Sequence, residues 1–218
     1  MSEYQYYEFA AIDRPLTPTD MSELRAVSTR AVITPSGFVN HYEWGDLKAD
    51  PADWIRRYFD AFVYTANWCS CRLALRVPLD TFRKAELKPF ATKYALTIEA
   101  SDEHWILDWA LDESDDYDRF AEDDGNGWMR RLVPLRDELL RGDLRPLYLG
   151  WLAGASSGEL REQQVVGHDE TRGGGINFGP RFDWRLAEGE QLQWQTFLQR
   201  NESDNRSRQH QEVLAGIP

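Results

Sequence analysis

A dense run of acidic side chains between residues 108 and 124 is the first feature of this sequence that could do chemistry. Its members are Asp108, Asp112, Glu113, Asp115, Asp116, Asp118, Glu122, Asp123 and Asp124. Calcium takes about six to eight oxygen ligands, so a divalent cation is the obvious ligand to consider. When the EF-hand pattern is placed on Glu122, however, its twelfth position falls on Val133, where a bidentate Glu is required. We therefore expect no metal and no cofactor here, but a solvated acidic loop that attracts a basic partner through Asp115, Asp116 and Asp118.

Cysteine and histidine side chains are sparse. Cys69 and Cys71 would share one face of a strand, but no second cysteine pair or histidine motif supplies the remaining ligands of a metal site. The four histidines are scattered along the chain: His41, His104, His168 and His210. His104 and Asp108 share a strand face but would stand about 13 Å apart, too far for a direct dyad. The sequence therefore predicts no catalytic residue.

The charge balance argues against nucleic acid as a direct ligand. The formal net charge is −12, and a negative field of this size repels phosphate backbones. The two arginine pairs, 56–57 and 130–131, are typical of solvated helix faces. The glycine-rich segment 173–179 has neither the Lys-Ser/Thr of a phosphate-binding loop nor the spacing of a dinucleotide-binding motif. In Arg141-Gly142-Asp143, the glycine is expected to end one helix and the aspartate to cap the next.

The sequence also indicates a compartment. The first fifteen residues lack the basic and apolar regions of a signal peptide. No apolar run approaches the roughly 20 residues of a membrane-spanning helix, and so few cysteines fit a reducing environment. We expect a cytoplasmic protein that does not enter the membrane.

Tryptophan is unusually frequent, with nine in 218 residues. Trp105 and Trp109 share one face of an expected β-hairpin. They are core residues if helices cover that face, and partner-binding residues if the hairpin is a sheet edge that accepts an added strand. Trp184 and Trp194 lie in a sparse tail too short to bury two indoles by itself. That tail must dock on the main body, on another subunit or on a partner.

The elements that position these residues follow from hydrophobic periodicity. Strands are expected over residues 4–12, 31–44 with a break at 35–37, 71–79, 94–99 and 105–111. Helices are expected over 17–29, 50–66, 81–90, 128–141 and 143–152. The helix over 50–66 carries the broadest apolar face, formed by Trp54, Ile55, Tyr58, Phe59, Phe62 and Val63, with Arg56, Arg57 and Asp60 on its polar face.

This order predicts an α+β fold with a mixed or antiparallel sheet of four or five strands and helices packed on one face. The chain begins in a partly ferredoxin-like order and ends in a helical hairpin and a tail. We expect a core domain over residues 1–155, a linker or long loop over 156–180, and an aromatic tail over 181–218.

Three strings, YQYYEFAAIDRPLT, ITPSGFVNHYEWGD and RPLYLGWLA, resemble in that order a group of uncharacterised bacterial proteins. The resemblance covers roughly residues 4 to 155. It implies a bacterial, cytoplasmic, non-secreted protein and carries no activity or functional residue with it.

Taken together, these observations favour a non-enzymatic protein-interaction or regulatory module. One alternative is a metal-dependent hydrolase that uses acidic residues brought together by the fold. A weaker alternative is an acidic protein associated with nucleic-acid machinery. A protein partner is expected, and self-association into a homo-oligomer is open.

Overall fold

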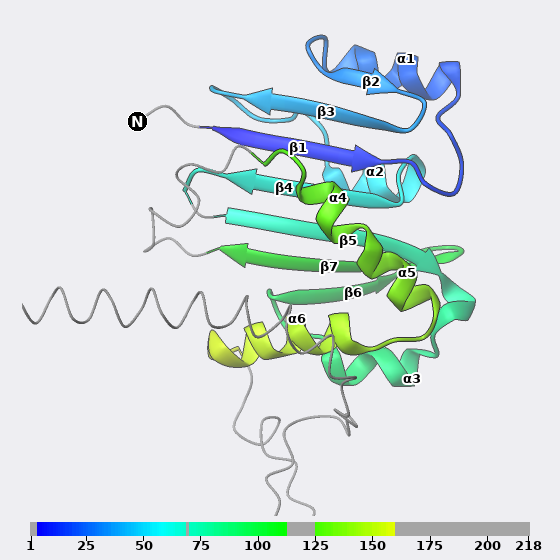
Figure 1. The fold of residues 1–218 in the computed structure, drawn as a ribbon, viewed down its shortest axis with the longest axis vertical. Coiled ribbons are helices and arrows are strands. Elements are labelled where there is room, and N and C mark those ends of the chain that lie inside the picture. The colour runs from blue at the N-terminus through cyan, green and yellow to red at the C-terminus, as the bar shows by residue number, and fades with distance from the viewer. Residues whose placement is uncertain (1–3, 69, 113–124, 160–218) are drawn as a thin grey trace, which may run out of the picture. The chain divides into compact units, whose positions relative to one another are not determined.

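The computed structural model describes residues 4–68, 70–112 and 125–159. The chain divides into two compact units, Met1–Pro180 and Arg181–Pro218. The second unit lies wholly outside the described residues, as does the predicted linker beyond residue 159. The described part of the first unit is built on a single β-sheet (Figure 1).

The sheet has seven strands, and every neighbouring pair is antiparallel. Its spatial order is β2-β3-β1-β4-β5-β7-β6. The strands are β1 (Gln5–Ala10), β2 (Val32–Thr34), β3 (Gly37–Tyr42), β4 (Ala61–Ala66), β5 (Ser70–Pro78), β6 (Leu96–Ala100) and β7 (His104–Asp112). The α+β class was predicted, and antiparallel pairing was one of the two alternatives, mixed or antiparallel, that the sequence left open. The four or five strands and the ferredoxin-like order were not found, because the sheet has more strands and no parallel pair that a β-α-β crossover would join.

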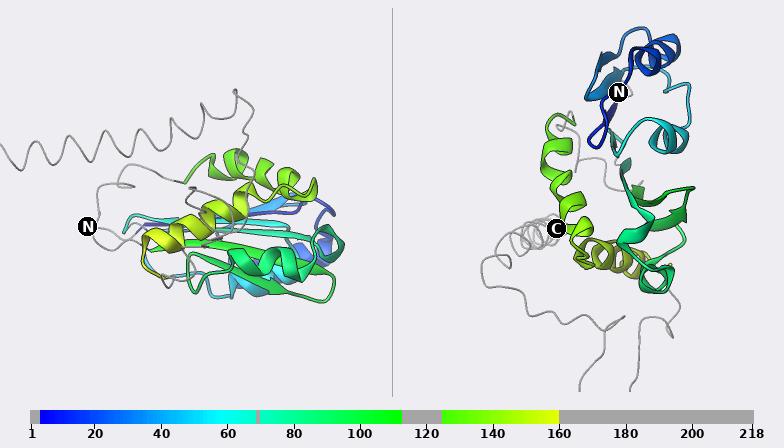
Figure 2. Two further views of the ribbon diagram at one scale, coloured as in Figure 1. Left: turned by 90° about the horizontal axis from the view of Figure 1, so that it is seen from below. Right: turned by 90° about the vertical axis from the view of Figure 1, so that its right-hand side faces the viewer.

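Helices cover both faces of the sheet, not one as predicted. The helices are α1 (Pro18–Val27), α2 (Pro51–Arg57), α3 (Lys84–Leu87), α4 (Trp128–Leu132), α5 (Pro134–Leu140) and α6 (Arg145–Ser156), with short 3-10 turns at Leu79–Thr81 and Lys88–Phe90. The right-hand view of Figure 2 shows α1 and α2 on one side of the sheet and α4 and α5 on the other.

Each face carries its own apolar core. The first core joins α1 and α2 to strands β1, β3 and β4, and includes Phe9, Phe38, Trp54, Ile55, Phe59 and Phe62. The second joins α3 to α6 to strands β4 to β7, and includes Val63, Leu75, Leu96, Leu107, Leu139, Leu147 and Trp151. Neighbouring residues of β4, Phe62 and Val63, belong to opposite cores, because successive side chains of a strand point to opposite faces.

The start of α1 confirms a sequence prediction in detail. The Thr17 hydroxyl accepts a hydrogen bond from the Asp20 N–H at 3.1 Å, and the Asp20 carboxylate accepts one from the Thr17 N–H at 2.8 Å. Pro18 occupies the first helical position, where its missing N–H is not needed. This reciprocal capping box fixes where the helix begins.

The helix predicted over 50–66 is only half present. The Asp50 side chain caps α2 through the Ala52 N–H at 2.9 Å, but the helix ends at Arg57 and residues 61–66 form strand β4. A strand buried on both faces has no polar alternation, so its apolar residues also satisfy a helical spacing. Of the six residues of β4, five are buried, and this strand pairs with β1 on one side and β5 on the other.

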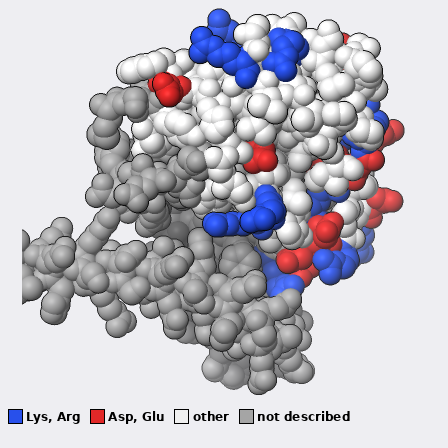
Figure 3. Space-filling model, turned by 45° about the horizontal axis from the view of Figure 1, so that its top comes forward, with Lys and Arg blue, Asp and Glu red and all other residues white. Residues whose placement is uncertain are grey.

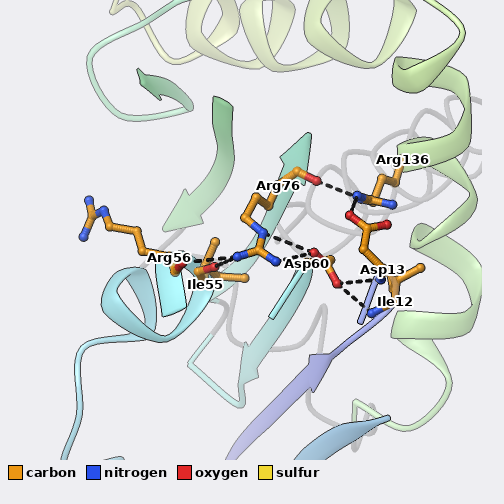
Figure 4. Close-up of polar contacts among 7 residues, drawn as sticks. All are labelled: Ile12, Asp13, Ile55, Arg56, Asp60, Arg76 and Arg136. Carbon is orange, nitrogen blue, oxygen red and sulfur yellow. Dashed lines mark hydrogen bonds and ion pairs between the residues drawn. The ribbon is translucent and has the colours of Figure 1, made fainter. Parts of the chain in front are cut away.

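A polar cluster around the buried Asp60 links α2 and the end of β1 to β5 and α5 (Figure 4). Asp60, only 1% exposed, accepts hydrogen bonds from the Ile12 N–H at 2.6 Å and the Asp13 N–H at 2.9 Å. Its other oxygen pairs with the Arg76 guanidinium, with a shortest distance of 2.6 Å. Arg136 then donates to the Arg76 carbonyl at 2.7 Å and pairs with Asp13 at 2.5 Å. The side chains in this cluster bond one another and the backbone, so we interpret it as a structural clasp.

Candidate functional site

Strand β6 ends the sheet, so no neighbouring strand pairs with one side of its backbone. In an antiparallel pair, residues alternate between those whose N–H and C=O point to the neighbouring strand and those whose groups point away from it. The Ser101 N–H bonds the His104 carbonyl at 2.8 Å, and the Ala110 N–H bonds the Ala95 carbonyl at 3.1 Å. The backbone groups of the odd-numbered residues of this segment, from Ala95 to Ser101, therefore point toward β7. The backbone groups of Leu96, Ile98 and Ala100 face outward.

The outward-facing groups are not all available. The Leu96 N–H donates to the Thr92 hydroxyl at 2.8 Å, and the Leu96 carbonyl accepts from the Thr92 N–H at 2.9 Å. Thr92 thus closes one end of the edge. Within the described residues, the outward N–H and C=O groups of Ile98 and Ala100 form no hydrogen bond.

The open stretch has distinct chemistry on its two faces. Glu99 is exposed on the face of the sheet that α2 covers, and its carboxylate pairs with Arg56 of α2 at 2.9 Å. The half-buried side chain of Ile98 packs against the second core on the opposite face. An added strand would therefore meet a charged pair on one face and an apolar margin on the other.

A groove of about 1030 Å³ lies at the other end of β6. Its walls come from β5 to β7, from the turn before β6 and from the residues after α6, and they include Arg72, Lys93, Tyr94, Thr97, Asp108 and Glu159. The Lys93 ammonium lies 4.4 Å from the centre of the Tyr94 ring, a cation–π arrangement. The groove thus presents charged and aromatic side chains beside the open strand.

Arg72 and Asp108 form an ion pair in the wall of this groove. The Arg72 Nε lies 2.8 Å and 2.9 Å from the two carboxylate oxygens, and its Nη2 also contacts Asp108. The hydrogen bond to Asp108 raises the pKa of Arg72. Arg72 therefore stays charged over the ordinary pH range, and its contacts with Asp108 tie β5 to β7 in the wall of the groove.

Glu159 fixes the groove wall where the chain leaves α6. Burial alone would raise its pKa, but the N–H groups of Tyr94 and Ala95 that it accepts from more than offset this and lower the pKa. The shortest of these bonds, to the Tyr94 N–H, is 2.7 Å. The residues after α6 are thereby tied to the turn that leads into β6.

The two hairpin tryptophans pack on the second core, Trp105 as a buried member and Trp109 half-buried against it, which favours the core alternative considered from the sequence. Trp105 is 6% exposed, and its indole N–H donates to the carbonyls of Leu79 and Phe82, each at 3.1 Å. Trp109 donates to the Pro146 carbonyl at 3.1 Å beneath α6. The hairpin also forms an edge of the sheet, with β6 as its outermost strand.

Most other sequence candidates lie outside the described residues or serve the structure. Asp115, Asp116, Asp118, Cys69, Trp184 and Trp194 are outside the described residues. Cys71 is half-buried on β5. Gly142 has φ +82° where α5 ends, as predicted for a helix stop. Asp143 accepts from the Arg145 N–H at 2.9 Å, but the cap position of α6 is Leu144, one residue later than predicted.

The described ranges contain no group of three or more His, Cys, Asp or Glu side chains placed to hold a metal ion. His41 lies on β3, and its Nδ1 is 2.7 Å from the Tyr4 hydroxyl. Within the same ranges, no helix is long and apolar enough to cross a bilayer.

Comparison with protein-family models, with curated proteins and with solved structures gave no match for this chain.

The open edge of β6 was only partly visible in the sequence. Alternation over residues 94–99 and 105–111 predicts the hairpin, but not which of its strands ends the sheet. That depends on β5 pairing with β7 over nine residues, a contact between separate segments. The paired Thr92 and Leu96 are a local signal that sequence reasoning missed.

Proposed function

We propose that this protein is a non-enzymatic protein-interaction module that binds an extended segment of a partner protein along β6. The segment would add to the sheet as an outer strand, with backbone hydrogen bonds supplying affinity and side-chain contacts supplying specificity. From the sequence we take the setting to be the bacterial cytoplasm.

The observation that carries the proposal is the pair of outward-facing peptide groups at Ile98 and Ala100. Exposed sheet edges invite strand addition, and natural proteins usually shorten or charge them. Here Thr92 closes one end and the Glu99–Arg56 pair marks the face beside the remainder. A short open stretch with defined flanks suits selective binding better than indiscriminate aggregation.

The groove supports the same proposal, since it extends the surface beyond the end of β6. Thr97 contributes to its wall and sits on the strand itself. A segment longer than the open stretch could place side chains against Tyr94, Lys93 and the Arg72–Asp108 pair. Aromatic and arginine side chains are common anchors in protein interfaces.

Replacing Ala100 with proline tests the proposal. Because the Ala100 N–H points outward, Ala100→Pro removes a binding group without removing a bond of the β6–β7 ladder. The matched control is Ile33→Pro on β2, the other edge strand. The Ala11 N–H bonds the Ser36 carbonyl, so the register places the Ile33 N–H outward as well.

The measurement is quantitative capture of partners from a bacterial extract that matches the source, using the full chain and both variants at equal folded concentration. A partner recovered with the wild type and with Ile33→Pro, but not with Ala100→Pro, supports strand addition on β6. Equal recovery with all three proteins, or no reproducible partner, contradicts it.

Two alternatives from the sequence keep their own tests. The metal-dependent hydrolase requires convergent carboxylates, and the acidic loop that could supply them lies outside the described residues, so metal analysis of the purified protein decides it. Association with nucleic acid requires a continuous charged track. On the face in Figure 3, the described Lys and Arg side chains stand in separate groups with wide uncharged surface between them.

A further inference from the structure

Trp44 is the most exposed of the large apolar side chains in the described residues. It is 72% exposed, whereas Trp54, Trp105 and Trp151 are 6% exposed or less. Burying an indole is normally favourable, and tryptophan is the strongest anchor residue in protein interfaces. Within the described ranges its ring makes no contact with another aromatic ring and has no cation over it.

The loop that carries Trp44 is held from below by a buried amide. Gln5 is 2% exposed, and its Oε1 accepts from the hydroxyls of Tyr7 at 2.8 Å and Tyr64 at 2.9 Å. Both hydroxyl donors orient the amide, so its Nε2 faces the loop. There it donates to the Gly45 carbonyl at 3.0 Å and to the Asp46 carboxylate at 2.7 Å.

The residues on either side of Asp46, Gly45 and Leu47, also hold the loop so that the indole of Trp44 faces solvent. Gly45 has φ +83°, a conformation that residues with a Cβ rarely adopt. Leu47 is buried in the first core immediately afterwards. The loop is therefore fixed on both sides of Asp46 while Trp44 faces solvent, so little ordering is required when the indole meets a partner.

The charges beside Trp44 select the kind of partner. Glu43 and Asp46 are exposed and flank it closely, and Asp50 follows at the cap of α2; Lys48 is the one basic residue between positions 43 and 50. A cation over an indole is attracted by the ring, and carboxylates beside the ring strengthen that attraction. The net charge of −12 also draws cationic partners toward the molecule.

Two other aromatic rings of this chain each have a basic side chain from the chain itself over the ring face. Lys93 lies over Tyr94, and Arg57 lies 4.7 Å from the centre of the Tyr58 ring. We propose that Trp44 receives a lysine or arginine side chain from a basic segment of a partner protein. This site is separate from β6 and does not depend on the function proposed for that edge.

The proposal can be tested on the full chain with a blocked tetra-arginine peptide, followed by nitrogen-15 NMR of the indole N–H signals. The Trp44 signal is identified as the one missing from Trp44→Leu. The expected result is a saturable shift of that signal, weakened by salt. Trp44→Leu should lower the affinity roughly 2- to 30-fold, which corresponds to the range of cation–π energies. Glu43→Gln should lower it less.

Val32→Ala is the matched control. Val32 is also an exposed apolar residue, at 64%, but it carries no aromatic ring and lies on β2, so this variant should bind the peptide like the wild type. Equal affinity in Trp44→Leu would overturn the proposal. So would an equal shift caused by tetra-glutamine, or the absence of a shift, and a larger shift with a neutral leucine-bearing peptide would assign the indole to an apolar partner instead.

Discussion

At the scale of single residues, Asp60 shows what a sequence pattern cannot reveal. Periodicity placed it with Arg56 and Arg57 on the polar face of a helix, yet it is 1% exposed. Two backbone N–H groups and the Arg76 guanidinium satisfy its carboxylate. A buried charge is tolerated only when it is paired and hydrogen-bonded. The partners of Asp60 lie 16 and 48 residues away in the sequence, so no local sequence pattern indicates them.

Asp60→Asn should therefore be strongly destabilising. The amide cannot replace the charge opposite Arg76, and its NH2 would face donors. Removing one partner of a buried pair typically costs about 3–5 kcal/mol of unfolding free energy. Urea unfolding at neutral pH measures the change. Asp53→Asn is the control, because Asp53 pairs with Arg56 in solvent and such pairs contribute about 0–1 kcal/mol. Equal effects at the two positions would contradict the assignment of Asp60 to a structural clasp.

The same carboxylate predicts a pH dependence. Burial alone would raise the pKa of Asp60, but the N–H groups of Asp13 and Ile12 and the Arg76 guanidinium more than offset it, so the pKa is lowered. A lowered pKa in the folded state contributes stability that is present above the unfolded value, near 3.9, and is lost as the pH falls toward the folded value. The stability difference between the wild type and Asp60→Asn should shrink as the pH is lowered from 7 toward 3. A constant difference would mean that the carboxylate does not titrate as proposed.

At the scale of elements, local signals were sufficient where the pattern and the environment agree. The capping box at Thr17 and the alternation of β5 and of the β6–β7 hairpin identify elements that the structure contains. The helix predicted over residues 61–66 was wrong for a physical reason. These residues form a central strand between two cores, and such a strand shows no polar alternation. The sequence could not predict the open edge of β6 for a second reason: which strand ends the sheet is known only once the pairing of all seven strands is known.

Gly150→Ala tests how closely α6 packs on the hairpin. A Cβ at this position would lie 2.7 Å from the indole of Trp109 and 2.8 Å from the Leu96 Cβ. Overpacking costs about 1–3 kcal/mol, while replacing Gly by Ala inside a helix returns about 1 kcal/mol. The net result should be a loss of up to about 2 kcal/mol in urea unfolding, with altered Trp109 fluorescence. Leu152→Ala on the exposed side of α6 should change stability by less than about 0.5 kcal/mol. A stabilised Gly150→Ala would show that α6 can move away from the sheet.

At the scale of the whole molecule, two cores share one sheet, so they should unfold together. β4 contributes Phe62 to one core and Val63 to the other, and neither core can be lost without removing half the burial of that strand. Cooperative unfolding is the ordinary behaviour of a domain with such shared elements. The order β2-β3-β1-β4-β5-β7-β6 interleaves distant segments, so loss of β4 would also separate β1 from β5.

One variant in each core tests this coupling. Ile55→Val, in the first core, should cost about 0.5–1.5 kcal/mol, and Leu139→Ala, in the second, about 2–5 kcal/mol, because both side chains are fully buried. Each variant should shift the circular dichroism and tryptophan fluorescence transitions to the same lower urea concentration. Because the two positions lie on opposite faces of the sheet, the double variant should show nearly the sum of the two losses. If instead Leu139→Ala separated the two transitions, leaving one at the wild-type midpoint, the two faces of the sheet would be independently folding layers.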